Sequence, residues 1–348
     1  MRRPSWAAPV AFHVLVTDTA GAFSLIAPRS LSSSFRSRSM ALRAGAALGL
    51  DDEISAWARE AGFGEVTSSK PQGSSGWSSF RRVQLSNGPD VFVKSSGRSC
   101  AEMFEGEALG LKAMFECSKG EGGLKIPEVY EYRDLSSGSG SFLVMEFLNL
   151  AGRSDDRALG RAIARMHLAE PTSEAGNPKG AFGFPLDNTI GGTTQLNGWT
   201  DGGGTDTWVA FFRDKRIGYQ LQLAGDSYCS KLWEEKIAPR LGAIFEGVDV
   251  KPSLLHGDLW SGNIGSADGR STIYDPAVYW GHHEAEWGMS WCASFGSAFW
   301  EGYRELIPED EGFLDRKPLY DAVSAPNLLS WYDGGLKNVD GPRIRSHV

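Results

Sequence analysis

The sequence has few cysteines, no excess of basic residues and no apolar run of membrane-spanning length. Its four cysteines, Cys100, Cys117, Cys229 and Cys292, lie far apart and form no Cys-x-x-Cys pair, so neither a zinc site nor a disulfide framework is expected. Acidic residues outnumber basic ones by 43 to 35, and the net charge of −8 argues against a nucleic-acid partner. Because no long apolar run occurs, we expect no membrane partner either.

The first fifty residues differ in composition from the rest of the chain. They contain six arginines, a serine cluster over residues 30–39, and Asp18 as their only acid. This composition is typical of an organelle transit peptide, so residues 1–45 are expected to be a transit peptide or a disordered extension. The whole chain of 348 residues is 41% hydrophobic, which is enough to build a two-lobed core after this segment.

The most informative segment runs from His256 to Asp275. It reads His-Gly-Asp-Leu-Trp-Ser-Gly-Asn and continues through a short apolar strand to Ile-Tyr-Asp. Asp258 and Asn263 are five residues apart, like the catalytic Asp and metal-binding Asn of protein kinases, and Asp275 follows where a second metal ligand is expected. Amide and carboxylate oxygens suit Mg²⁺, which leaves Asp258 to accept the proton of an attacking hydroxyl. The segment therefore predicts a kinase that uses ATP and Mg²⁺.

A nucleotide-binding lobe is predicted upstream of this segment. Residues 80–95 alternate around Asn-Gly-Pro as a β-hairpin does, and the second strand ends at Lys94, the candidate for contacting the α- and β-phosphates. A helix is expected over residues 101–115, with Glu107 as the candidate to hold this lysine. The alternative is that the three glutamates of this helix form a solvated face.

Two further segments fit the same lobe. Gly73 and Gly76 lie in a glycine- and serine-rich run, where backbone N–H groups can approach phosphate oxygens, although such runs are also common in plain turns. The apolar segment with Met145, Glu146 and Phe147 is similar to the strand that joins the two lobes of a kinase and contacts adenine. A core strand with one exposed carboxylate is the alternative for this segment.

Four longer motifs carry a resemblance to a known family. They are Met-Phe-Glu-Gly-Glu-Ala-Leu-Gly-Leu at 103–111, Gly-Phe-Pro-Leu-Asp-Asn-Thr-Ile-Gly at 183–191, Leu-His-Gly-Asp-Leu-Trp-Ser-Gly-Asn at 255–263 and Asp-Pro-Ala-Val-Tyr-Trp-Gly-His at 275–282. Residues 51 to 320 thereby resemble the fructosamine/ketosamine-3-kinase family, relatives of aminoglycoside phosphotransferases. The resemblance implies an α/β (α+β) bilobal protein-kinase-like fold, with a small β-rich N-lobe over residues 50–148 and a larger, mostly helical C-lobe with the acceptor site over residues 149–348.

The resemblance also implies an activity, ATP-dependent phosphorylation of the 3-hydroxyl of ribulosamines or fructosamines. The acceptors would be free ketosamines or glycated proteins, and breakdown of the phosphorylated adduct would free the amine as a deglycation repair. The most similar branch of the family is plastid-targeted, which favours a plastid address over a mitochondrial or cytoplasmic one. Two rival functions stay open: a kinase for another hydroxyl, as in aminoglycosides, and a non-catalytic nucleotide-binding protein. The oligomeric state is left open.

Residue by residue, the resemblance makes Asp258 the base, Asn263 and Asp275 the metal ligands, and Trp260 a residue that faces the sugar. A core-packing tryptophan is the alternative for Trp260. His256 is expected to brace the loop rather than to move protons.

Other segments have less specific roles. Asp187 and Asn188, in an aromatic-rich segment, are candidates to line the sugar pocket. The run His-His-Glu-x-Glu over residues 282–286 is expected to start a helix rather than to bind a metal. The chain departs from the family in its glycine-rich loop, where many members carry a cysteine and this chain reads Gly76-Trp77-Ser78, and it departs again after Tyr320.

Overall fold

The computed structural model describes residues 49–153 and 155–324. The expected transit peptide and the divergent segment from residue 325 onward lie outside these residues. The described chain begins with a helix and a five-stranded antiparallel sheet in the order β1-β2-β3-β5-β4, with one long helix inserted between β3 and β4. These elements are α1 (Leu50–Glu60), β1 (Val66–Ser74), β2 (Ser79–Leu85), β3 (Val91–Ser96), α2 (Ala101–Cys117), β4 (Val129–Asp134) and β5 (Ser141–Glu146).

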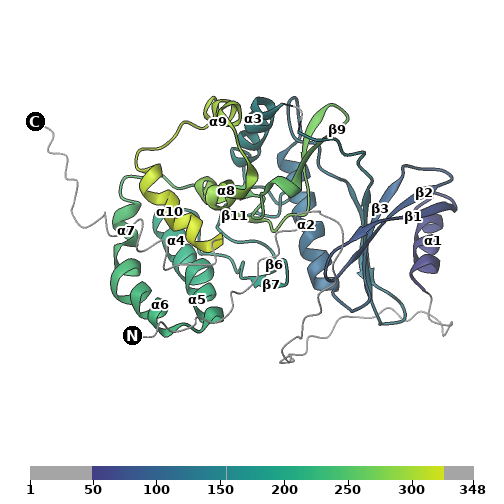
Figure 1. Ribbon diagram of the computed structural model, residues 1–348, viewed down its shortest axis with the longest axis horizontal. Coiled ribbons are helices and arrows are strands. Elements are labelled where there is room, and N and C mark those ends of the chain that lie inside the picture. The colour runs from purple at the N-terminus through teal and green to yellow at the C-terminus, as the bar shows by residue number, and fades with distance from the viewer. Residues whose placement is uncertain (1–48, 154, 325–348) are drawn as a thin grey trace, which may run out of the picture. The chain divides into compact units, whose positions relative to one another are not determined.

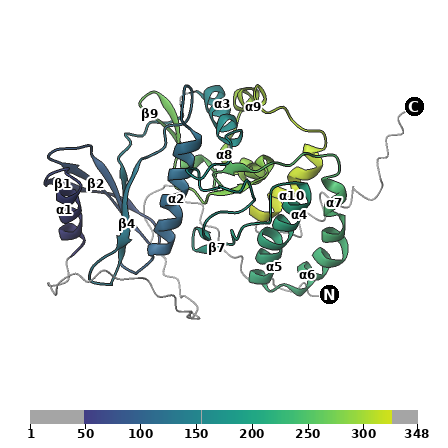
Figure 2. The same ribbon diagram turned by 180° about the vertical axis from the view of Figure 1, so that it is seen from behind.

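The sheet is buried on both faces because its central strands alternate apolar side chains. Phe142 and Val144 of β5 belong to a cluster with Trp57 of α1, whereas Leu143 and Met145 join the larger core that contains α2. Figures 1 and 2 show α1 and α2 on opposite faces of this sheet. The β2–β3 hairpin pairs Phe80 with Lys94, so the hairpin predicted over residues 80–95 is present.

The rest of the described chain is mostly helical, with three small two-stranded sheets. Its elements are α3 (Asp156–His167), β6 (Asn188–Ile190), β7 (Thr193–Gln195), α4 (Thr205–Phe211), the π-helix η1 (Phe212–Gly218), α5 (Tyr219–Ala224), α6 (Ser227–Leu232), the π-helix η2 (Trp233–Ile237), the 3₁₀ helix η3 (Ala238–Arg240), α7 (Leu241–Ile244), β8 (Ser253–Leu255), the 3₁₀ helix η4 (Ser261–Asn263), β9 (Ile264–Ala267), β10 (Arg270–Ile273), β11 (Tyr279–Gly281), the 3₁₀ helix η5 (His283–Met289), α8 (Ser290–Ala293), α9 (Ser297–Arg304) and α10 (Phe313–Ser324).

Helices α3 and α9 approach each other closely because each presents a glycine. A Cβ atom on Gly160 would lie 2.1 Å from the carbonyl oxygen of Phe299, and one on Gly302 would lie 2.1 Å from that of Arg157. Below them, Trp287 of η5 contacts the rings of Phe299 and Tyr303 edge-on. This packing supports the strands and turns that carry the polar residues described next.

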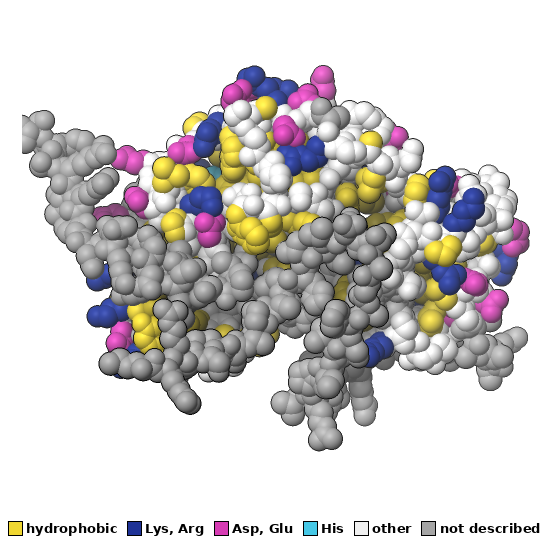
Figure 3. All heavy atoms as spheres, viewed as in Figure 1, with side chains coloured by type: hydrophobic (Ala, Val, Ile, Leu, Met, Phe, Trp, Pro, Cys, Tyr) yellow, Lys and Arg dark blue, Asp and Glu magenta, His cyan; other side chains and the backbone are white. Residues whose placement is uncertain are grey.

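The five-stranded sheet followed by a helical region confirms the predicted kinase-like fold. Among the described residues, every helix is either too short or too polar to cross a lipid bilayer. In Figure 3, basic and acidic side chains are interspersed over the described part of the visible face. Hydrophobic side chains appear between them in several patches.

Candidate active site

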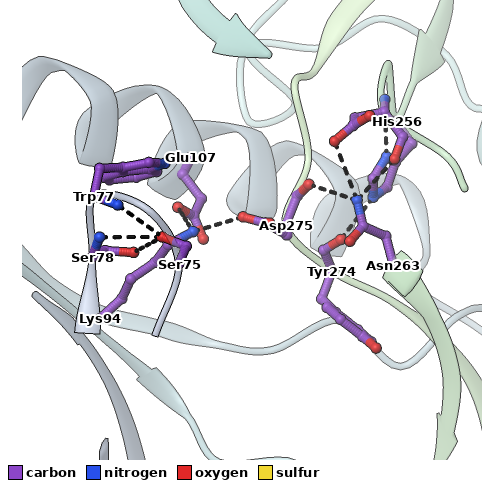
Figure 4. A network of polar contacts seen from close by, with 10 residues as sticks. Ser75, Trp77, Ser78, Lys94, Glu107, His256, Asn263, Tyr274 and Asp275 are labelled. Atoms are coloured by element: carbon purple, nitrogen blue, oxygen red, sulfur yellow. Dashed lines mark hydrogen bonds and ion pairs between the residues drawn. The ribbon is translucent and has the colours of Figure 1, made fainter. Parts of the chain in front are cut away.

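The segment from His256 to Asp275 forms a loop, a 3₁₀ turn and a hairpin that fold back on themselves. The amide Nδ2 of Asn263 donates to the backbone oxygen of Asp258 at 2.9 Å and lies 3.4 Å from Asp258 Oδ2. The same Nδ2 lies 3.3 Å from the backbone oxygen of Asp275. Figure 4 shows these contacts converging on Asn263. The three residues that the sequence predicted to act together are therefore neighbours in space.

Lys94 joins this loop to the strand and helix of the upstream sheet. Its Nζ lies 2.7 Å from Glu107 Oε2 and 2.6 Å from Asp275 Oδ1. Burial of Lys94 opposes its charge, but the two carboxylates outweigh burial and raise its pKa above the usual value. The charge of Lys94 lowers the pKa of Asp275 in turn, against the opposing effect of burial. The predicted Lys94–Glu107 pair is present, and Asp275 extends it across both parts of the chain.

Asp258 is a half-buried carboxylate with a strongly perturbed pKa. Burial and the negative charge of Asp275 raise the pKa of Asp258 to about 7, although the hydrogen bond from Asn263 opposes the shift. A carboxylate with a pKa near neutral pH is ionised in a large fraction of molecules and is also basic enough to accept a proton from a hydroxyl. The environment of Asp258 therefore suits general base chemistry.

His256 holds the loop through both nitrogens of its ring. Its Nε2–H donates to the backbone oxygen of Tyr274 at 3.0 Å, and its Nδ1 accepts the backbone N–H of Asp258 at 3.2 Å. Burial lowers the pKa of His256, so the ring stays neutral in the tautomer that these bonds require. The structure thus agrees with the bracing role expected for this residue.

Glu286 is a loop-positioning residue that the sequence did not indicate. Its carboxylate accepts the backbone N–H of His256 at 2.6 Å and that of Gly257 at 3.0 Å. His167 Nε2 lies 3.4 Å from the same carboxylate, and His167 Nδ1 lies 2.9 Å from the hydroxyl of Tyr303. Although burial would raise the pKa of Glu286, these contacts lower it, so the residue is an anion. The sequence contains Glu286 within the run 282–286 but carries no signal that it reaches back thirty residues.

The glycine- and serine-rich run forms the turn between β1 and β2. Gly73 has a positive φ of 123° at a register irregularity in β1, a conformation that favours glycine. Gly76 lies at the tip, where a Cβ atom would meet nothing within 4 Å. The turn stands next to Lys94, because the Trp77 ring lies over the ammonium. Its predicted contact with phosphates is compatible with this position.

The end of β5 and the residue that follows it, the segment expected to contact adenine, use backbone N–H groups within the fold. Met145 is buried in the core, and the Glu146 side chain forms an ion pair with Lys125. The N–H of Glu146 donates to the backbone oxygen of Glu128, and the N–H of Phe147 donates to that of Asp90. An adenine ring contacting this segment would therefore meet its carbonyl groups rather than these two N–H groups.

The candidate sugar-binding residues divide into two kinds. Trp260 is half-buried, and its ring covers the next turn so tightly that a Cβ atom on Gly262 would lie 2.1 Å from it. Asp187 is exposed, and its Oδ1 accepts the backbone N–H of Asn197 at 2.6 Å. Asn188 is only 4% exposed and donates to the backbone oxygen of Val278 at 2.7 Å. Asn188 is therefore placed to hold the loop together, whereas Trp260 and Asp187 retain exposed surface.

The run over residues 282–286 starts η5, as predicted. His282, His283 and Glu284 gather with Asp310 within 4.8 Å, a spacing that a metal ion could bridge. However, Arg316 donates to both oxygens of Glu284, at 2.7 and 2.6 Å, so a cation already neutralises this carboxylate. We explain the cluster as an internal ion-pair and hydrogen-bond network.

The donor set around Asn263 and Asp275 fits Mg²⁺ better. The side-chain nitrogen of Asn263 is used by the loop, and no described residue donates to its oxygen, which leaves that oxygen as a ligand atom. The Asp275 side chain is 56% exposed, so a hydrated cation could reach it. One carboxylate and one amide oxygen, with water completing the shell, match what Mg²⁺ prefers.

The chain is similar in sequence to known proteins. A family model described as fructosamine kinase matches residues 63–336. Protein-ribulosamine 3-kinase, chloroplastic, of Oryza sativa subsp. japonica is 40% identical over 316 residues, covering 89% of this chain and 87% of the relative. Ketosamine-3-kinase of Mus musculus is 31% identical over 271 residues, covering 71% of this chain and 84% of the relative.

Solved structures give the same picture of the fold. A structure described as a proposed fructosamine-3-kinase from Haemophilus somnus superposes with a TM-score of 0.64 and 26% identity, covering 80% of this chain and 90% of that one. A ternary complex of a thermostable mutant of aminoglycoside phosphotransferase APH(4)-Ia with AMP-PNP and hygromycin B has a TM-score of 0.51 and 14% identity, covering 83% and 97% of the two chains. The second likeness shows a shared fold.

Proposed function

The chain belongs to the fructosamine kinase family, and from this membership we propose that it transfers the γ-phosphoryl group of ATP to the 3-hydroxyl of a ribulosamine or fructosamine. It is a ketosamine kinase, related in sequence to protein-ribulosamine 3-kinases and to a mammalian ketosamine-3-kinase. One observation carries the proposal for the site: Asp258, Asn263 and Asp275 lie in one network with the Lys94–Glu107 pair.

In the proposed mechanism, Asp258 is the general base. The acceptor hydroxyl donates its proton to the Asp258 carboxylate while its oxygen forms a bond to the γ-phosphorus and the bond from that phosphorus to the bridging oxygen of ADP breaks. Such a base contributes roughly 10²–10⁴ in rate. Lys94, held by Glu107, would contact the α- and β-phosphates, and the β1–β2 turn with Gly73 and Gly76 would cover them.

Asn263 and Asp275 would hold Mg²⁺, which when bound neutralises charge on the β- and γ-phosphate oxygens. The carbonyl groups of the segment Met145, Glu146 and Phe147 would contact adenine. Trp260 would lie against the sugar, with Asp187 at the edge of the acceptor site. In this arrangement residues 50–148 form the nucleotide lobe, and residues 149–348 form the acceptor lobe.

A plastid location fits the proposal. The rice relative is described as chloroplastic, and this chain has an arginine- and serine-rich first segment over residues 1–45. Fusing this segment to a fluorescent protein tests the address. Plastid import of the fusion would support the proposal, and mitochondrial import or a diffuse cytosolic signal would contradict it.

The activity is tested by giving the full chain, and in parallel a form lacking residues 1–45, Mg-ATP with a ribulosamine, a fructosamine, an aminoglycoside or no acceptor. ADP release should depend on a ketosamine. In the same assay Asp258→Ala should lose on the order of 10²–10⁴ in turnover while keeping nucleotide affinity, measured by calorimetry. Asp249→Ala, which removes an exposed carboxylate, is the matched control and should behave like the wild type.

Other results of this assay would favour one of the rival functions or refute the role of Asp258. Turnover with the aminoglycoside alone would favour the related hydroxyl kinase. Nucleotide binding without turnover on any acceptor would favour a non-catalytic protein. Undiminished turnover by Asp258→Ala would refute its assignment as the base.

A further inference from the structure

The turn between β1 and β2 carries Trp77 at its tip and is fixed by its own hydrogen bonds. The N–H of Ser75 donates to the backbone oxygen of Ser78 at 2.8 Å, and the two serine hydroxyls lie 2.8 Å apart. The N–H of Ser78 also lies 3.1 Å from Ser75 Oγ. Because these bonds close the turn from within, the position of Trp77 follows from the turn rather than from a flexible loop.

Trp77 covers one side of the Lys94 charge cluster. Lys94 Nζ lies 5.3 Å from the centroid of the Trp77 ring and 5.9 Å from that of Phe80. The indole also packs near Phe104 of α2, with ring centroids 5.8 Å apart. Figure 4 shows Trp77 beside Lys94 and Glu107, on the opposite side of the lysine from the catalytic loop.

The two partners of the Lys94–Asp275 ion pair differ in exposure. The Lys94 side chain is 6% exposed, whereas that of its partner Asp275 is 56% exposed. Water and phosphate can therefore reach the cluster from the side of Asp275, and the indole closes the side of the turn. The face of an aromatic ring stabilises an ammonium group that has lost its water. The indole can neither attack the phosphate, because it has no oxygen, nor act as a base, because its N–H only donates.

We propose that Trp77 is a water-excluding positioning residue, which directs the γ-phosphoryl group to the sugar hydroxyl rather than to water. This inference rests on the proposed kinase function. The inference goes beyond that function, because phosphorylation of a ketosamine does not by itself require an aromatic side chain at the β1–β2 turn.

The competing reaction is hydrolysis of ATP. A water oxygen bonds to the γ-phosphorus, the bond to the bridging oxygen of ADP breaks, a water proton passes to Asp258, and ADP and inorganic phosphate leave. A closed, dry site suppresses this side reaction. Removing the indole opens a second path for water into the site, past Lys94, and a water molecule that then reaches the acceptor position can attack the γ-phosphorus in line.

The first test compares wild type, Trp77→Ala and Trp77→Phe, each as the full chain. Release of inorganic phosphate without acceptor is divided by phosphoryl transfer to a lysine derivative that carries ribulose. This ratio should rise several-fold in Trp77→Ala and stay near the wild-type value in Trp77→Phe. Phe115→Ala removes an exposed aromatic ring from the other end of α2 and should leave the ratio unchanged.

The second test needs no nucleotide. An acylating reagent is applied to the free protein, and labelling of Lys94 is compared by peptide mass mapping with that of Lys112, an exposed lysine of α2 that lies 5.3 Å from the Tyr132 ring. Labelling of Lys94 relative to Lys112 should rise several-fold in Trp77→Ala and not in Trp77→Phe.

The outcomes separate this inference from the proposed function. Equal loss of hydrolysis and transfer in Trp77→Ala, or unchanged labelling of Lys94, would overturn the inference. If wild type transfers to no ketosamine but Trp77→Ala still raises both hydrolysis and Lys94 labelling, the proposed acceptor fails and the role of Trp77 stands.

Discussion

At the residue scale, Lys94 is the side chain that connects the upstream sheet and α2 to the loop that carries Asp275. It is buried, and it pairs with Glu107 of α2 and with Asp275 beyond β10. Neither carboxylate is near Lys94 in sequence, so the fold itself assembles the charges. The ammonium is already deprived of water before a phosphate arrives, which lowers the desolvation cost of binding an anion.

Replacing Lys94 by methionine should weaken productive ATP binding about 10- to 100-fold, because a hydrogen bond to a charged group contributes roughly 1.5–3 kcal/mol. The KM for ATP and the affinity for Mg-ADP, measured by calorimetry, check this. Lys112→Met, in the exposed part of α2, is the control. A Lys94→Met protein with the wild-type KM for ATP would show that the lysine serves only the fold.

At the element scale, the catalytic loop is positioned by an element outside it. Glu286 of η5 accepts two consecutive backbone N–H groups, those of His256 and Gly257, directly before Asp258, the proposed base. His167 of α3 contacts the same carboxylate. The conformation of the loop over residues 256–258 therefore depends on contacts from η5 and α3 and not on the sequence of the loop alone.

Glu286→Gln should reduce kcat by up to about 100-fold while the KM for ATP changes little, because the amide group cannot accept both N–H groups and the base moves. The free energy of unfolding should also fall by about 1–3 kcal/mol. Steady-state kinetics and urea denaturation measure the two effects. Glu301→Gln, at an exposed carboxylate of α9, should change neither. Equal changes in kcat and in ATP affinity would argue against loop positioning.

The crossing of α3 and α9 makes a separate prediction about stability. Gly302→Ala would place a Cβ atom 2.1 Å from the carbonyl oxygen of Arg157, so the helices must separate, at a cost of about 1–3 kcal/mol. Gly242→Ala in α7 meets nothing within 4 Å and should be neutral or slightly stabilising. Thermal melting of both variants checks the difference. Equal melting temperatures would show that the two helices are not tightly packed.

Elements with regular local patterns could be predicted from the sequence, and others could not. The β2–β3 hairpin and α2 follow from alternating and helical apolar spacing. The π-helical segments η1 and η2 have the same kind of apolar spacing as an ordinary helix, so the sequence does not distinguish them. Asp258 and Asn263 could be predicted because their separation is local. Glu286 could not, because its contact spans thirty residues and uses backbone groups.

At the scale of the whole molecule, buried histidines make stability depend on pH. Burial, and the positive charges nearby, lower the pKa of His282 well below its usual value and that of His283 to about 3. In the unfolded chain both rings take up a proton as the pH falls through about 6.5, whereas in the folded chain they stay neutral to a much lower pH. Between these values the unfolded state binds more protons at the two rings, so their contribution to stability falls as the pH falls below about 6.5.

Each of these histidines should remove up to about 1.4 kcal/mol of stability per pH unit in that window. Asp258 and Glu107, whose pKa values burial raises to about 7, take up protons in the folded state over the same range and offset part of this loss. The histidine contribution is therefore measured as a difference: between pH 7.5 and pH 5 the melting temperature of His283→Gln should rise relative to that of the wild type, because one of the two histidines no longer titrates. A difference between the two proteins that does not change with pH would mean that His283 is protonated in the folded protein.

The architecture as a whole was predictable because its motifs are long and spread over much of the chain, which fixes the order of the lobes. The roles of the candidate sugar-binding residues were harder to predict. Asn188 has the same kind of amide as Asn263, yet burial and the carbonyl of Val278 turn it into a structural support. Sequence cannot distinguish an amide that faces a ligand from one that closes a turn, since both occur in polar loops.

Asp275 has a left-handed backbone with a φ of 57°, a conformation that costs a residue other than glycine about 1 kcal/mol. Glycine would fit there more easily, although it would bring no carboxylate to the cation or to Lys94. Relief of that strain is smaller than the cost of leaving the buried Lys94 with one carboxylate instead of two. Directed evolution for heat resistance should therefore retain Asp275, so that stability and turnover favour the same residue at this position.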